Sequence, residues 1–161
     1  MNTLATGAVV VAILTTALIY GTDLFCALVL RPAAHGAADS SVADLLGRVH
    51  EFGDRRLPAP GVISILATAL AIAASDTLAA RIGGAIALLA LLAWLAIYLR
   101  ISAPINRQLR AAAASHTVPA DTRTLQQRWD SVIWPRAALQ AVALAGLLTI
   151  ILTRYGLSPL R

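Results

Sequence analysis

Four long apolar stretches dominate this chain of 161 residues and limit what it can fold into. They cover residues 4–30, 60–75, 82–100 and 135–153. A transmembrane helix needs about 20 mostly apolar residues. Charged residues make up only 13% of the chain, against about 25% in soluble domains. The sequence therefore predicts one all-α membrane domain over residues 1–161, built as a bundle of four transmembrane helices.

The two long connections between these stretches contain apolar residues at helical spacing. In the first connection they are Val42, Leu45, Leu46, Val49 and Phe52, and in the second Leu125, Trp129, Val132 and Ile133. We therefore expect short amphipathic helices at the membrane interface over residues 41–52 and 121–134, the second running into the fourth span. The first apolar stretch is expected to be a retained helix and not a cleaved signal peptide, because no positive charge precedes it.

All 13 basic residues are arginines, and their distribution is uneven. Ten lie in or beside the two long connections, and three lie in the short turn or near the C-terminus. The positive-inside rule then predicts a multi-pass protein of the cell membrane, with both connections cytoplasmic and both termini outside. Charges clustered between apolar stretches also argue against a nucleic-acid partner, which a basic face would bind. The lipid bilayer is the predicted partner.

Asp23 is a carboxylate inside an apolar stretch. A charge at membrane depth costs about 2.5–3.5 kcal/mol on insertion scales, so it normally faces the bundle interior with a partner. Tyr20 lies three residues earlier, on the same helical face. Two interpretations of Asp23 remain open: a structural salt bridge to an arginine of the connections, or a site carboxylate that acts as base or ligand anchor.

Arg136 and Gln140 continue the apolar stripe of the helix expected over residues 121–134, so both are predicted to face inward. Arg136 is a candidate counter-ion for Asp23 or for an anionic substrate, and Arg100 is an alternative for that role. The plainer interpretation is that Arg136 marks the membrane interface.

His50 borders the apolar stripe of the first connection and can face the mouth of the bundle. Histidine titrates near neutral pH, so His50 could serve as a base, a haem ligand or a metal ligand. A surface histidine without a role is the alternative. The sequence has neither an HExxH motif nor a cysteine cluster, and Cys26 is its single cysteine, so no dedicated metal site is predicted.

Trp94 and Tyr98 lie four residues apart near the end of the third stretch. Aromatic residues at this depth commonly form a belt at the membrane interface. The alternative is that the two rings wall a pocket for a flat aromatic ligand.

Several short motifs follow one another in a recognisable order. They are Gly21 and Phe25 ahead of Arg31-Pro32, the turn Pro104-Ile105-Asn106, and Trp129 followed by Arg136. In this order the chain resembles the anthrone oxygenase-like family of small four-helix membrane proteins, long catalogued as a domain of unknown function. The resemblance covers nearly the whole chain. The family pattern often has a histidine between the tryptophan and the arginine; here that place holds Ile133, so His50 would have to supply any imidazole.

The resemblance implies oxidation of anthrones to anthraquinones with no metal or flavin, in which a base removes an acidic C–H proton and the carbanion reacts with dioxygen. On this hypothesis Asp23 or His50 is the base. Arg136, Arg100 or Asn106 would stabilise the developing enolate oxygen. The residues expected to hold a flat lipophilic substrate are Tyr20, Trp94, Tyr98, Arg100, Trp129 and Gln140.

Two other functions remain open. The chain could be a membrane protein that binds haem or another small ligand, with His50 as the axial ligand. It could also be a non-catalytic subunit or a small transporter, in which Asp23 binds a proton or cation; transport is the weakest hypothesis because the four spans show no internal symmetry. Assembly as a homo-oligomer stays open in each case.

Overall fold

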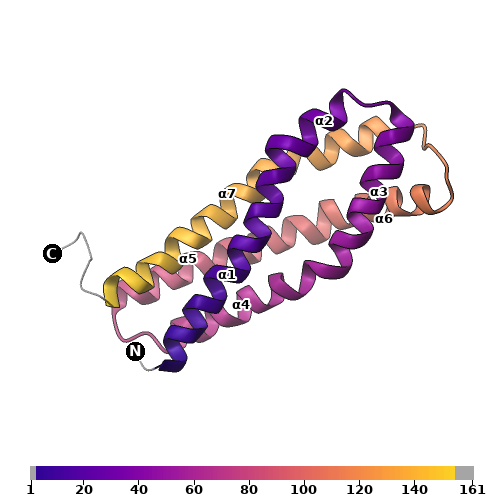
Figure 1. The fold of residues 1–161 in the computed structure, drawn as a ribbon. Coiled ribbons are helices and arrows are strands. Elements are labelled where there is room, and N and C mark those ends of the chain that lie inside the picture. The colour runs from indigo at the N-terminus through magenta and orange to yellow at the C-terminus, as the bar shows by residue number, and fades with distance from the viewer. Residues whose placement is uncertain (1–2, 155–161) are drawn as a thin grey trace.

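The computed structural model describes residues 3–154 as a bundle of four long helical rods (Figure 1). The first rod comprises α1 (Thr3–Phe25), a π-helical turn (Cys26–Leu30) and α2 (Arg31–His35). The second comprises α3 (Asp39–Arg56) and α4 (Pro58–Ala73). The third comprises α5 (Leu78–Ile97), a second π-helical turn (Tyr98–Ser102) and α6 (Ala103–Ala114), and the fourth is α7 (Thr122–Arg154). Each rod contains a stretch long and apolar enough to cross a membrane, which confirms the predicted four-span membrane protein.

One end of the bundle holds most of the arginines. The start of α1, the turn between α4 and α5, and the end of α7 lie together, while α2, α3 and α6 lie at the opposite end (Figure 1). We call this opposite end, which contains residues 31–56 and 100–134, the arginine-rich end. About 20 residues of helix cross the hydrocarbon layer. Counting that length from the α4–α5 turn reaches Arg55 and Arg56 on the second rod and Ile97 on the third, and we infer that the boundary of the layer lies near these residues.

The first rod does not end with the predicted span at residue 30, just before Arg31-Pro32. The backbone N–H of Arg31 donates to the carbonyl of Cys26, so a π-helical turn directly precedes the proline. A proline has no N–H and its ring clashes with the preceding turn of an α-helix. The wider turn accommodates Pro32, and the helix continues to His35. The third rod repeats this device, with the second π-helical turn just before Pro104.

Both helices predicted in the connections are present; the first is longer than expected, and the second begins at Thr122 and runs into the fourth span as predicted. The first is α3, and the second forms the beginning of α7, which passes through Pro135 without ending. α6 was not predicted, because its alanine-rich sequence has no long apolar run. Alanine has the highest helix propensity, and α6 packs along α3 with Ile105 and Leu109 buried. The two connections are thus built into the bundle.

Small residues let the membrane half of the bundle pack closely. α5 and α7 form the most extensive helix pair, and Gly83 and Gly146 face each other across it. A Cβ atom on Gly146 would meet the carbonyl oxygen of Gly83 and lie 3.1 Å from the Cβ of Ala87. Small residues at such crossings are typical of membrane helices, whose association depends on close packing.

We expect Gly146→Leu to lower the free energy of unfolding by about 1–3 kcal/mol, because the added side chain forces α5 and α7 apart. Thermal unfolding in detergent measures this loss. Gly21→Leu is the matched control, since a Cβ atom at Gly21 meets no heavy atom within 4 Å. An equal loss in both variants would contradict the proposed packing.

Two apolar clusters form the core of the bundle. The cluster in the membrane half is centred on Val9, Leu91, Leu147 and Ile150. The cluster at the arginine-rich end is centred on Leu46, Ile105, Leu109 and Ile133. Buried polar side chains from all four rods lie between them: Asp23, His50, Ser102, Asn106, Arg136 and Gln140. This polar layer is the feature of the fold that calls for a functional explanation.

Candidate functional site

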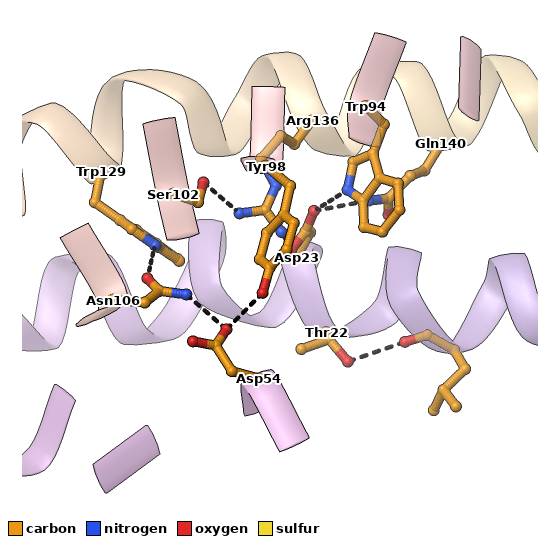
Figure 2. A network of polar contacts seen from close by, with 11 residues as sticks. Thr22, Asp23, Asp54, Trp94, Tyr98, Ser102, Asn106, Trp129, Arg136 and Gln140 are labelled. Atoms are coloured by element: carbon orange, nitrogen blue, oxygen red, sulfur yellow. Dashed lines mark hydrogen bonds and ion pairs between the residues drawn. The ribbon is translucent and has the colours of Figure 1, made fainter. Parts of the chain in front are cut away.

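The centre of the polar layer is an ion pair between Asp23 and Arg136. The Nη2 atom of Arg136 lies 2.7 Å from Oδ1 of Asp23. The other carboxylate oxygen accepts from Nε2 of Gln140 at 2.7 Å and from Nε1 of Trp94 at 3.2 Å (Figure 2). Both charged side chains are buried, with exposed fractions of 8% for Arg136 and 6% for Asp23. The predicted pairing of Asp23 with Arg136 and the inward direction of Gln140 are thus confirmed.

Aromatic rings surround the guanidinium group of Arg136. Its Cζ atom lies 6.0 Å from the ring centroid of Trp94, 5.7 Å from that of Tyr98 and 5.9 Å from that of Trp129. Nη1 donates to Ser102 at 2.9 Å. Such contacts stabilise a cation in a dry environment. Among residues 3–154, Nε of Arg136 is fully buried and has no hydrogen-bond partner, so the hydrogen bonds of the guanidinium group are not all satisfied within the protein.

Asp54 is the centre of a second polar network next to the first (Figure 2). One carboxylate oxygen accepts from the hydroxyl of Tyr98 at 2.8 Å and from Nδ2 of Asn106 at 2.9 Å. The other lies 3.5 Å from Nη1 of Arg110. Asn106 in turn accepts from Nε1 of Trp129 at 3.1 Å. Every polar atom of the Asn106 side chain is therefore engaged, and its role is to hold Asp54 and Trp129 in place.

His50 is the exception among these polar groups. It is only 6% exposed, and its ring packs against Trp129 with 5.3 Å between ring centroids. Neither ring nitrogen has a hydrogen bond to another of the described residues. A buried imidazole with free nitrogens can accept a proton from a bound molecule.

A cavity of about 290 Å³ joins these groups. The sequence-predicted site residues that line it are Asp23, His50, Trp94, Tyr98, Asn106, Trp129 and Arg136. Most of the remaining lining is apolar and includes Ile19, Leu57, Pro58, Val62, Leu95 and Leu99. Such a cavity, mostly apolar with a few placed polar groups, is typical of a binding site for a small lipophilic molecule.

Three predicted site residues do not line the cavity. Gln140 lies behind Asp23 and contacts its carboxylate. Tyr20 is half-buried on a neighbouring face of α1, and Arg100 is exposed. Arg100 is exposed because the π-helical turn Tyr98–Ser102 changes the helical register. Tyr98 and Ser102 face inward in its place.

Sequence reasoning missed two aspartates. Asp54 lies in a run of charged residues that suggests a solvated surface, although its position four residues after His50 places both on one helical face. Asp130 is also buried and lies 3.0 Å from Nε2 of His35 and 2.7 Å from Nε2 of Gln126. The contact between Asp130 and His35 joins α7 to α2 at a place outside the cavity. Within residues 3–154 no group of three or more His, Cys, Asp or Glu is arranged to hold a metal ion.

No protein-family model, curated protein or solved structure matches the chain. The function must therefore be inferred from the geometry of the site.

Proposed function

We propose that this four-span membrane protein oxidises a flat lipophilic aromatic substrate with dioxygen, in the manner of an anthrone oxygenase. The observation that supports this most directly is the apolar cavity in which His50, with free ring nitrogens, and the guanidinium of Arg136 lie among the rings of Trp94, Tyr98 and Trp129. The rings would hold a planar substrate, and the two polar groups are a base and an anion-stabilising cation.

His50 is more available to a bound substrate than Asp23 is. The carboxylate of Asp23 already accepts from three donors, one of them the charged guanidinium of Arg136. These donors occupy both carboxylate oxygens, so the carboxylate is less available to a substrate than a side chain without partners. The ring nitrogens of His50 accept no hydrogen bond from, and donate none to, another of the described residues. Asp23 is therefore assigned the task of positioning Arg136, and His50 that of removing the proton.

The reaction needs a base and a stabilised anion. With an anthrone, His50 removes a proton from the methylene carbon opposite the carbonyl, and the negative charge moves to the carbonyl oxygen, where Arg136 stabilises it. The carbanion adds to dioxygen to form a C–O bond, and protonation gives a hydroperoxide. Loss of the second C–H proton and cleavage of the O–O bond release water. One anthrone and one dioxygen thus give one anthraquinone and one water.

The arginine distribution supports an orientation for this site. Ten arginines lie at or beside the arginine-rich end and three elsewhere, so the proposal places that end in the cytoplasm and both termini outside. The cavity would then lie at the cytoplasmic boundary of the hydrocarbon layer.

Oxygen uptake by the protein in lipid vesicles tests the proposal. With anthrone as substrate, we expect uptake above that of protein-free vesicles, with one dioxygen consumed for each anthraquinone formed. Uptake equal to that of protein-free vesicles would contradict the proposed function. A Soret band in the purified protein that is lost in His50→Ala would favour haem binding instead.

A further inference from the structure

The cavity has an apolar rim and a polar floor. Four lining residues are exposed on the outside of the bundle, and all are apolar: Val49, Pro58, Val62 and Leu99. Every charged or titratable lining residue is buried or half-buried. An exposed apolar patch around a cavity is typical of a ligand-binding groove or of a surface that contacts a membrane. This arrangement suits a mouth that faces lipid.

The depth of the rim agrees with this interpretation. α4 has 16 residues and is about 24 Å long at 1.5 Å per residue. The hydrocarbon layer is about 30 Å thick, so the whole of α4 and the end of α3 lie within it. Val62 and Pro58 therefore face hydrocarbon, Leu99 lies at its boundary, and Val49 lies beyond it on α3.

The helix packing explains why the bundle opens at this point. α4 packs against both α1 and α5, whereas α3 packs mainly against α6. The second rod therefore stays beside the third rod but separates from the first rod where α4 and α3 meet, at Leu57. Thr22 on α1 and Gly53 on α3 flank this place, and both line the cavity. A Cβ atom on Gly53 would have only the Cδ1 atom of Leu57 within 4 Å, so the space directly beside Gly53 is open.

We infer that the substrate reaches the cavity sideways from the hydrocarbon layer, past Val62, and is therefore a neutral aromatic molecule that partitions into the bilayer. The identity of the substrate rests on the proposed function, whereas the entry route is inferred from the apolar rim of the cavity. A charged analogue with the same ring system, confined to water, is excluded because its path crosses the apolar rim.

Ligand binding followed by tryptophan fluorescence tests this route without any turnover. Trp94 and Trp129 line the cavity, and the exposed Trp134 is removed as Trp134→Phe. The protein in lipid vesicles is mixed with anthraquinone or with its sulfonate, which stays in water. We expect saturable quenching by anthraquinone and none by the sulfonate.

Val62→Phe narrows the rim, and Leu66→Phe is its matched control. Both residues face outward on α4, with exposed fractions of 52% and 64%, and only Val62 lines the cavity. Val62→Phe should slow quenching by about tenfold or more, within the one to three decades over which association rates vary at one site, while Leu66→Phe leaves it unchanged. Equal rates in the two variants, quenching by the sulfonate, or no saturable quenching at all would overturn the route. Binding without oxygen uptake would contradict the proposed function and leave the route standing.

Discussion

Asp23→Ala is expected to lower the free energy of unfolding by about 3–5 kcal/mol, the usual cost of removing one partner of a buried ion pair. The carboxylate is the acceptor for Arg136, Gln140 and Trp94, so its loss leaves a buried guanidinium without a counter-ion. Thermal unfolding in detergent, or the yield of folded protein, measures the effect.

Two controls separate the buried charge from a general loss of packing. Asp23→Leu combined with Arg136→Met removes both charges and should recover most of the lost stability, since a buried pair can often be replaced by apolar residues. Asp44→Ala breaks the ion pair with Arg48, in which both side chains are 52% exposed. That exposed pair contributes about 0–1 kcal/mol to the free energy of unfolding. If Asp23→Ala and Asp44→Ala lower the free energy of unfolding by the same amount, Asp23 does not hold Arg136 in place.

His50→Gln is expected to slow oxygen uptake with anthrone by about 10²–10⁴-fold, the usual contribution of a positioned general base. Glutamine is similar in size and can form hydrogen bonds, so the packing against Trp129 is largely kept and anthraquinone should still quench the tryptophan fluorescence. The comparison of uptake with quenching distinguishes lost chemistry from lost binding. Unchanged uptake in His50→Gln would mean that another group removes the proton.

The spans and the central ion pair could be predicted because each rests on a local pattern. Long apolar stretches have one stable arrangement in lipid, in which helices satisfy their own backbone hydrogen bonds. A carboxylate within such a stretch must find a partner; the sequence offered Arg136 and Arg100 as candidates, and the structure pairs Asp23 with Arg136. The same reasoning predicted the inward direction of Gln140.

Other parts of the site depend on features that a local pattern does not contain. The two π-helical turns change the helical register, so Arg100 lies outside and Ser102 inside. Asp54 is partnered by Tyr98 and Asn106 from another rod, and the residues around it in the sequence are charged and exposed. α6 has too few large apolar residues to be recognised until α3 is packed against it. These features arise from contacts between rods that are distant in the sequence.

Rescue by imidazole tests most directly the division of roles between His50 and Asp23. His50→Ala leaves space in a cavity that a small base can enter, so added imidazole should restore oxygen uptake with anthrone in proportion to its concentration. Asp23→Ala, in which Arg136 has lost its partner but His50 is intact, should not respond to imidazole. This result would establish His50 as the base and Asp23 as a positioning residue. Failure of imidazole to restore oxygen uptake by His50→Ala, or recovery of Asp23→Ala by imidazole, would contradict that assignment.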